Sequence, residues 1–192
     1  MNLPNKLTVA RILLVPFFVA ALLIVFPLHH LAALALFALA SITDLFDGKI
    51  ARKKGLVTDF GKFADPLADK ILVISALLCF VQCGLCDCVA VIVVLFREFT
   101  VTSIRLVAAS QGKVIAANIW GKVKTVTQMV AIICILAMQT LLDTAKLGAN
   151  LPCCLDNIFY IAGEALIWIS TFFTVLSGIV YVVQNKHFIS EK

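Results

Sequence analysis

Four aspartates in residues 43–71 have a spacing that suits metal-assisted chemistry. Asp44 and Asp47 are three residues apart, and Asp65 and Asp69 are four apart. Residues at either spacing share one face of a helix, so each pair can point the same way. Carboxylate oxygens favour hard cations such as Mg²⁺, Mn²⁺ or Ca²⁺. Two such ions side by side stabilise the attacking and leaving oxygens of a phosphoryl displacement. The spacing therefore predicts a divalent-metal centre for transfer of a phosphorus-containing group.

Small residues and an arginine accompany the aspartates. Gly48 and Ala51 lie on or near the face of the first pair and leave room for a flat ligand or a close helix, and Gly61 does the same in the next segment. Arg52 follows Asp44 by eight residues, roughly two turns, and its guanidinium suits a phosphate. The alternative is that the aspartates form structural ion pairs with nearby Lys and Arg. That alternative explains a single carboxylate better than four at these spacings.

The composition places these residues in a membrane protein. The chain has 192 residues, of which 62% are hydrophobic and 14% charged. A soluble domain is about half apolar and about a quarter charged. Much of this chain must therefore be solvated by lipid. The same numbers exclude a disordered chain, a coiled coil and a small disulfide-rich secreted domain.

Six apolar runs predict an all-α, polytopic membrane protein. The runs are long and continuous, which favours helices over the short alternating strands of a barrel. A short interfacial segment at residues 2–7 is expected before them, and residues 1–192 are expected to form one membrane domain. The expected spans are residues 12–28, 31–42, 71–85, 89–109, 125–142 and 158–183.

The length of the second apolar run indicates how deep in the membrane the aspartates lie. Residues 31–42 are too few to cross a bilayer, so the helix must continue through Asp44 and Asp47. The carboxylates then lie at one edge of the membrane. With six spans, Lys146 alone of the 16 Lys and Arg falls on the side opposite the termini. The positive-inside rule makes the termini and the aspartates cytoplasmic and accounts for the net charge of +5 without nucleic acid.

Cysteine and histidine are expected to lie away from this centre. The spacing Cys83-x2-Cys86-x-Cys88 resembles that of metal ligands. The favoured interpretation is that these cysteines act as small apolar residues near lipid. An external disulfide is the other alternative to a metal site. His29 and His30 are expected at the external interface. Further cysteines lie at positions 79, 134, 153 and 154.

The acidic segment resembles a known family signature. The pattern D-x2-D-G-x2-A-R-x8-G-x3-D-x3-D resembles that of the CDP-alcohol phosphatidyltransferases, with no departure in residue type or spacing. The matching positions are Asp44, Asp47, Gly48, Ala51, Arg52, Gly61, Asp65 and Asp69.

Other stretches are similar to the bacterial branch of this family that uses glycerol 3-phosphate. They are M-N-L-P-N-K-L-T-V-A-R at the start, D-P-L-A-D-K, R-E at 97–98 and W-G-K-V-K-T at 120–125. The resemblance covers residues 1–130, and nothing familiar appears at 141–156. It implies six transmembrane helices in a homodimer of the bacterial inner membrane. The implied reaction transfers a phosphatidyl group from CDP-diacylglycerol to sn-glycerol 3-phosphate and releases CMP.

The resemblance also implies roles for the matched residues. The four aspartates would bind two divalent ions, Mg²⁺ or Mn²⁺, that hold the CDP diphosphate. Asp69 would be the general base on the acceptor hydroxyl. Gly48, Ala51 and Gly61 would line the cytidine pocket, and Arg52 would contact CDP-diacylglycerol.

The acceptor carries a phosphate dianion, so a basic cluster is expected near the aspartates. Arg105, Lys122 and Lys124 are the candidates for this acceptor site, and each has the alternative of a positive-inside anchor. Arg97 lies within a span and is expected to pair with Glu98 or with a motif carboxylate.

Three other functions remain open at this point. Another member of the family would use a different acceptor, such as inositol phosphate, serine or phosphatidylglycerol. A cation transporter would use the carboxylates for its ion, although such sites usually lie near the membrane midplane in repeated folds. A non-catalytic scaffold would leave the four carboxylates unexplained.

Overall fold

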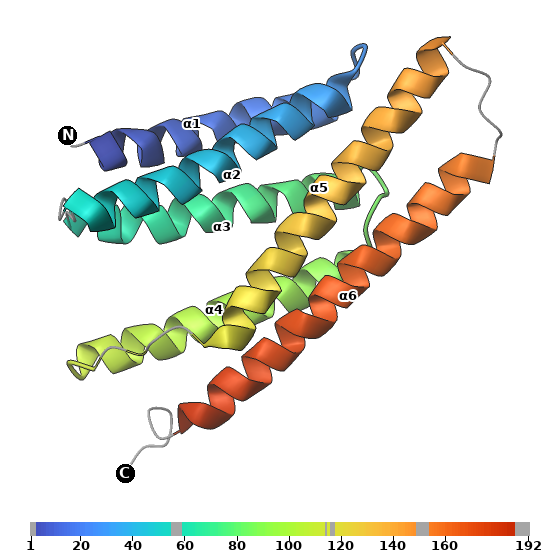
Figure 1. The fold of residues 1–192 in the computed structure, drawn as a ribbon. Helices are drawn as coiled ribbons and strands as arrows, with labels where there is room; N and C mark the ends of the chain where they lie inside the picture. Colours follow the sequence, from blue (N-terminus) through green and yellow to red (C-terminus); the bar gives the residue numbers. More distant parts are fainter. Residues whose placement is uncertain (1–2, 55–58, 114, 116–117, 149–153, 187–192) are drawn as a thin grey trace. The chain divides into compact units, whose positions relative to one another are not determined.

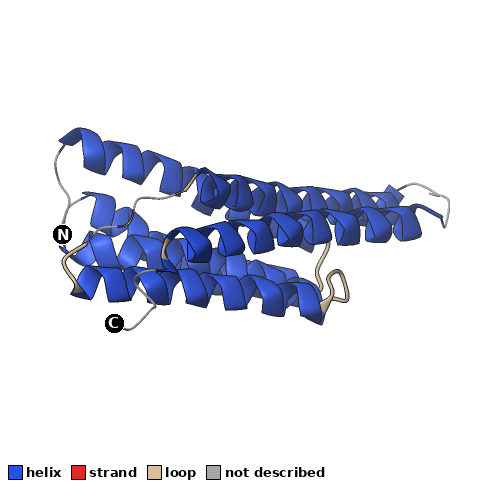
Figure 2. Ribbon diagram, turned by 90° about the horizontal axis from the view of Figure 1, so that it is seen from below, coloured by secondary structure: helices blue, strands red, loops and turns tan. Residues whose placement is uncertain are grey.

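Every element in the described part of the chain is an α-helix, as the sequence predicts. The computed structural model describes residues 3–54, 59–113, 115, 118–148 and 154–186, and contains no strand in these ranges. Within them, the side chains of residues 3, 4, 6, 44–54, 59–66, 69, 146, 148 and 154 are outside what the structure describes. The helices are α1 (Leu3–Leu23), α2 (His29–Lys54), α3 (Asp59–Gln82), α4 (Cys88–Ser110), α5 (Ile119–Gly148) and α6 (Cys154–Gln184) (Figures 1 and 2).

The first two helices differ in their bounds from the predicted spans. Helix α1 runs unbroken from Leu3, so the described residues show no separate interfacial segment before it. It ends at Leu23 rather than at 28, and the chain turns through Leu28, whose φ is +60°. Helix α2 continues well past residue 42 to Lys54, which agrees with the expected extension through the acidic segment.

The chain divides into two compact units. The first comprises residues 1–83 and 132–159, and the second comprises residues 84–131 and 160–192. Helices α5 and α6 are each divided between the two units, with one end in the first unit and the other end in the second. The acidic segment therefore belongs to the first unit, and the candidate acceptor residues belong to the second.

In the first unit, α1 packs against both α2 and α3 (Figure 1). Phe18 of α1 and Phe37 of α2 are fully buried, and their ring centroids lie 5.7 Å apart. Val15 and Leu22 continue the buried face of α1 at helical spacing. This packing holds together the two helices that carry the aspartates.

In the second unit, α6 presents a buried face of small and polar residues. Small residues let helices approach closely within a membrane. Val101 and Ile104 of α4 pack on Tyr181 at one end of this face. The start of α4 is capped by Asp87, whose Oδ1 accepts from the Val89 amide at 2.9 Å. Buried residues of α6 recur every three or four positions, at Gly163, Ile167, Ser170, Thr174, Ser177 and Tyr181, and Thr171 beside them is buried too.

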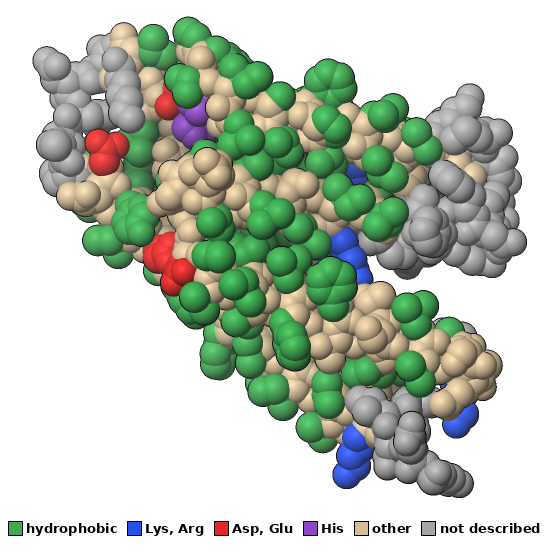
Figure 3. Space-filling view, turned by 180° about the vertical axis from the view of Figure 1, so that it is seen from behind, with side chains coloured by type: hydrophobic (Ala, Val, Ile, Leu, Met, Phe, Trp, Pro, Cys, Tyr) green, Lys and Arg blue, Asp and Glu red, His purple; other side chains and the backbone are tan. Residues whose placement is uncertain are grey.

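Two helices are long and apolar enough to cross a membrane: Ile119–Ala145 and Leu155–Gln184. Shorter apolar helices cover Leu7–Leu23, His29–Thr43 and Lys70–Gln82, as judged on the described residues. Helix α4 interrupts its apolar sequence with Arg97, Glu98 and Arg105. Hydrophobic side chains dominate the face drawn in Figure 3, which is unusual for a protein surface in water.

Candidate active site

The acidic motif is divided between two continuous helices. Asp44 and Asp47 lie in α2, and Asp65 and Asp69 lie in α3. Both helices contact α1, so the two halves of the motif belong to one packed unit. The aspartate side chains are outside the described residues, so their convergence stays a prediction. The same holds for Gly48, Ala51 and Arg52 in α2 and for Gly61 in α3.

Helix α1 adds a buried polar stripe that the sequence reasoning did not single out. Asn5, Thr8 and Arg11 follow one another at intervals of three residues and are 7%, 0% and 1% exposed. Each of the three side chains has at least one interaction partner. This end of α1 lies beside the end of α2 and the start of α3 (Figure 1). A charge this deeply buried is costly unless it is paired.

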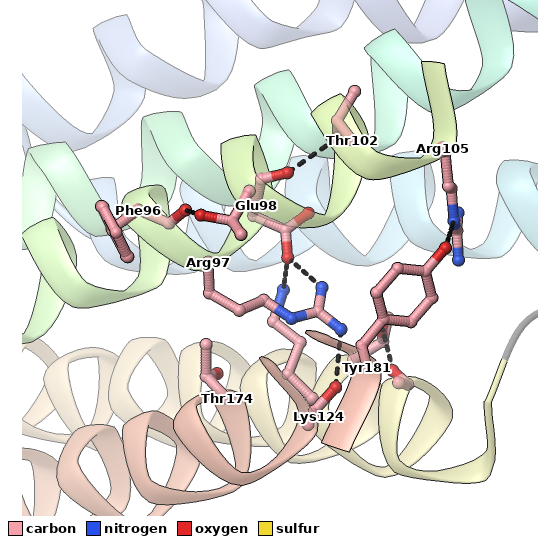
Figure 4. A network of polar contacts seen from close by, with 12 residues as sticks. Phe96, Arg97, Glu98, Thr102, Arg105, Lys124, Thr174 and Tyr181 are labelled. Carbon is pink, nitrogen blue, oxygen red and sulfur yellow. Dashed lines mark hydrogen bonds and ion pairs between the residues drawn. The ribbon is translucent and has the colours of Figure 1, made fainter. Parts of the chain in front are cut away.

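A buried ion network occupies the second unit (Figure 4). Arg97 Nη1 donates to Glu98 Oε1 at 2.6 Å, and Lys124 Nζ donates to the same oxygen at 2.7 Å. The three side chains are only 12%, 13% and 8% exposed. Arg97 thus pairs with Glu98, which is one of the two partners that the sequence predicts for it. Two cations share one carboxylate, so these three groups carry a net charge of +1 (2 − 1).

Arg97 also bonds to α6 and lies near Gly121 of α5. Its Nη2 donates to Ser177 Oγ at 2.6 Å. A methyl group on Gly178 would lie 3.0 Å from Arg97 Cγ, and one on Gly121 would lie 3.7 Å from Arg97 Nη2. The absence of a side chain at Gly178 therefore makes room for the arginine stem. Arg97 Nε is buried with no hydrogen-bond partner in the described part of the chain.

The other candidate acceptor residues differ in their surroundings. Arg105 is exposed, and its guanidinium carbon lies 5.6 Å from the centre of the Tyr181 ring. Its Nε donates to Tyr181 Oη at 3.3 Å, so the tyrosine orients the arginine. Lys122 is exposed on the first turns of α5. The structure therefore joins Lys124 to Arg97 through Glu98 and leaves Lys122 at the surface.

Residues 1–176 match the family described as CDP-alcohol phosphatidyltransferase. This match covers both halves of the acidic motif and most of the second unit. The chain belongs to the CDP-alcohol phosphatidyltransferase family.

Named relatives narrow the comparison within this family. The chain is 44% identical over 196 aligned residues to the CDP-diacylglycerol–glycerol-3-phosphate 3-phosphatidyltransferase of Bacillus subtilis, covering 96% of this chain and 95% of that protein. It is 38% identical to the protein of the same name from Rickettsia bellii, covering 97% of each. A probable phosphatidylglycerophosphate synthase of Mycobacterium tuberculosis is 45% identical over 134 residues, which cover 68% of this chain and 64% of that protein.

CDP-alcohol phosphatidyltransferases use divalent metal ions, and the donor set here fits such ions. The motif offers four carboxylates from two helices and neither a thiol nor an imidazole. Oxygen-only donors suit Mg²⁺ or Mn²⁺ rather than a soft metal. Asp44, Asp47, Asp65 and Asp69 are therefore the residues that would hold the ions.

The structure also bears on the predictions made for the cysteines and histidines. Cys79, Cys83, Cys86 and Cys88 are free thiols, and the described residues contain no group of three cysteine ligands. Cys153 and the side chain of Cys154 lie outside the described residues. His29 and His30 are largely buried beside Asp143. Their place at the external interface of the membrane stays a prediction. No sequence signal connects these histidines to an aspartate 113 residues away.

Proposed function

We propose that this protein transfers the phosphatidyl group of CDP-diacylglycerol to sn-glycerol 3-phosphate, giving phosphatidylglycerophosphate and CMP. The observation that carries the proposal is the 44% identity to the Bacillus subtilis enzyme of that name across 96% of this chain. The complete acidic motif supports it, because the chemistry depends on those residues. The chain is then an enzyme of phospholipid biosynthesis.

The four motif aspartates hold two divalent ions in this proposal. When bound, the ions neutralise the pyrophosphate and stabilise the departing CMP. Asp69 accepts the proton of the acceptor hydroxyl. The hydroxyl oxygen then forms a bond to the phosphorus that carries the lipid, and the bond from that phosphorus to the CMP oxygen breaks. The protein contributes orientation as well as a base, since placement of the two substrates lowers the barrier.

The nucleotide and the acceptor bind through different residues. Gly48, Ala51 and Gly61 leave room for the cytidine, and Arg52 binds a phosphate of CDP-diacylglycerol. These residues lie on the same two helices as the aspartates.

Arg105, Lys122 and Lys124 bind the acceptor phosphate in the proposal. Support comes from the positive charge left on the network of Arg97, Glu98 and Lys124. Glu98 holds the ammonium of Lys124 in place, and Tyr181 orients Arg105. Fixed cations bind a phosphate dianion without first losing side-chain freedom, which favours affinity.

We also propose that all six helices cross the membrane as one domain, in a homodimer of the bacterial inner membrane with both termini and the active site cytoplasmic. The two long apolar helices and the exposed apolar surface support membrane insertion. The distribution of Lys and Arg supports the orientation.

The test is an acceptor series with the purified protein in lipid nanodiscs. CDP-diacylglycerol and Mg²⁺ are supplied with glycerol 3-phosphate, inositol phosphate, serine or phosphatidylglycerol, and released CMP and the lipid product are measured. We expect CMP and phosphatidylglycerophosphate with glycerol 3-phosphate, and neither product when EDTA is added. CMP release with another alcohol but not with glycerol 3-phosphate would contradict the proposed acceptor. Ion flux without CDP-diacylglycerol in liposomes would instead favour a transporter.

A further inference from the structure

Two histidines and an aspartate meet in the first unit, away from the acidic motif. His29 and His30 open α2, and Asp143 lies in the last third of α5. His30 Nδ1 is 2.8 Å from Asp143 Oδ2, and His29 Nε2 is 4.0 Å from the same oxygen. One ligand atom from each residue lies within 4.8 Å of the other two.

The cluster is largely shielded from water. The side chains of His29, His30 and Asp143 are 13%, 11% and 15% exposed. The two imidazole rings pack with centroids 3.9 Å apart, and Phe26 packs against His29 at 5.9 Å. Water therefore has little access to the donor atoms of these three side chains.

The donor set is that of a transition-metal site. Two imidazole nitrogens and a carboxylate oxygen suit Zn²⁺ and related ions, with a water molecule as the usual fourth ligand. Bonds of about 2.0–2.1 Å in a tetrahedral site place neighbouring donors about 3.4 Å apart. The observed separations of 2.8 Å and 4.0 Å lie on either side of this value, and the two imidazole nitrogens lie within 4.8 Å of each other. Side-chain rotations would bring the three donors to equal distances around an ion.

This cluster is distinct from the motif aspartates. His29 and Asp44 are 15 residues apart on α2, which is about 22 Å along the helix axis. The motif offers only oxygen donors, whereas this cluster offers nitrogen. A metal that prefers imidazole would therefore distinguish the two places.

We propose that His29, His30 and Asp143 form a binding site for Zn²⁺ or a similar transition-metal ion. The site joins the start of α2 to the end of α5 within the first unit. The ion would restrain the turn that connects α1 to α2, because His29 follows Leu28 with its positive φ directly. This inference does not depend on the proposed transferase activity.

The experiment is Co²⁺ and Zn²⁺ binding to the full-length protein in excess Mg²⁺, purified with a tag that contains no histidine. Co²⁺ in a four-coordinate site with imidazole ligands absorbs visible light strongly, whereas Co²⁺ in an octahedral oxygen site absorbs weakly. We expect one such Co²⁺ per chain, displaced by Zn²⁺. Zn²⁺ at 100 times its Kd should raise the ratio of folded to unfolded protein about 100-fold.

Variants assign the signal to the cluster. His29→Gln, His30→Gln and Asp143→Asn should each weaken Zn²⁺ binding at least about 10–100-fold, the loss seen when even an outer-shell partner is removed. His187→Ala removes the chain's third histidine and should leave binding unchanged, as should Asp44→Asn in the acidic motif. Circular dichroism of each variant checks that it is folded.

Two results would overturn the proposal. One is the absence of the intense Co²⁺ spectrum in the wild-type protein. The other is a spectrum that persists in folded His29→Gln and Asp143→Asn variants. Loss of the spectrum in Asp44→Asn alone would move the site to the acidic motif. None of these readouts involves CMP release, so failure here and failure of the proposed transferase are separate results.

Discussion

Asp69 ends the acidic motif in α3, four residues after Asp65. As the proposed base, it must be ionised to accept the hydroxyl proton. Asp69→Asn keeps the size of the side chain but removes this capacity, so we expect CMP release to fall at least about 100-fold. Asp156→Asn, the same change at an exposed carboxylate in the first turn of α6, is the control and should retain activity. Near-normal turnover in a folded Asp69→Asn protein would remove Asp69 from this role.

Lys124 and Lys122 are two residues apart in α5 but occupy different environments. Lys124 is buried and bonded to Glu98, whereas Lys122 is exposed. Lys124→Met removes one of the two cations on Glu98 and should lower the free energy of unfolding by about 2 kcal/mol, since Arg97 still pairs with that carboxylate. Lys122→Met should change it by less than about 0.5 kcal/mol. Denaturant titrations in mild detergent measure both.

A double-mutant cycle checks that the Lys124 effect comes through Glu98. We expect Glu98→Gln with Lys124→Met to cost clearly less than the sum of the two single changes, since each removes the same contact. Additive costs would mean that the 2.7 Å contact between Lys124 and Glu98 contributes little to stability.

The acceptor site permits a second kind of measurement. Arg105 is exposed and oriented by Tyr181, so Arg105→Ala should leave the fold intact. It should raise the KM for glycerol 3-phosphate about tenfold or more, the effect of losing one charge-assisted hydrogen bond, without a similar change for CDP-diacylglycerol. An unchanged acceptor KM would count against Arg105 as a phosphate ligand.

For single residues, the sequence predicts which residue types stand at which spacing, but it does not predict whether a side chain is buried or exposed. Sequence reasoning found the motif and the pairing of Arg97 with Glu98, because both are local patterns. It could not separate Lys122 from Lys124, because burial depends on which face of α5 meets α4. It also missed Arg11 as a buried charge, since the stripe of α1 becomes visible only when its neighbours are known.

At the scale of the helices, Gly178 controls how closely α6 approaches α4. A methyl group there would meet Arg97 Cγ at 3.0 Å, while Arg97 is fixed at Glu98 and Ser177. Gly178→Ala should therefore reduce stability, despite a gain of about 1 kcal/mol in helix propensity. Gly121→Ala would make an ordinary contact at 3.7 Å and is the matched control, expected to be neutral or stabilising. Equal melting temperatures for the two variants would contradict this expectation, because they would show that the Arg97 side chain shifts without loss of stability.

Helix existence was predictable here, and helix ends were less so. The apolar run through residues 24–26 does not stop where α1 stops, so hydropathy extended the first span to 28. Pro27 is the sequence signal for the turn, because a proline disfavours helical geometry at the residue before it. The positive φ of Leu28 is not predicted by that signal. Helix α2 was placed correctly through Asp47 because a run of 12 apolar residues cannot span a bilayer.

For the whole molecule, the side of the membrane on which the loop between α3 and α4 lies tests the proposed topology. Six spans place this loop on the external side, with Cys88 exposed at the start of α4 and Cys86 buried. In single-cysteine variants, a membrane-impermeant thiol reagent should label Cys88 in intact cells. Labelling of Cys88 only after the membrane is opened would contradict six spans with cytoplasmic termini.

The pH dependence at Cys86 is a separate expectation. Burial raises the pKa of the Cys86 thiol to about 12, and the negative charges of Glu164 and Asp87 add to the shift. The thiolate is the reactive form, so only about one Cys86 in ten thousand is reactive at pH 8. The rate of its alkylation should rise about tenfold for each pH unit between 7 and 10. A rate that levels off below pH 9 would contradict this environment.

The most direct test of the whole account counts Mn²⁺ ions bound with CDP-diacylglycerol. The protein carries His29→Gln and His30→Gln, so that the histidine cluster cannot contribute, and free Mn²⁺ is followed by electron paramagnetic resonance. We expect two ions per chain, and a loss of at least one in Asp44→Asn or Asp65→Asn. Stoichiometric binding that is unchanged by these substitutions, or no Mn²⁺ binding at all, would contradict a metal centre built by the four aspartates of α2 and α3.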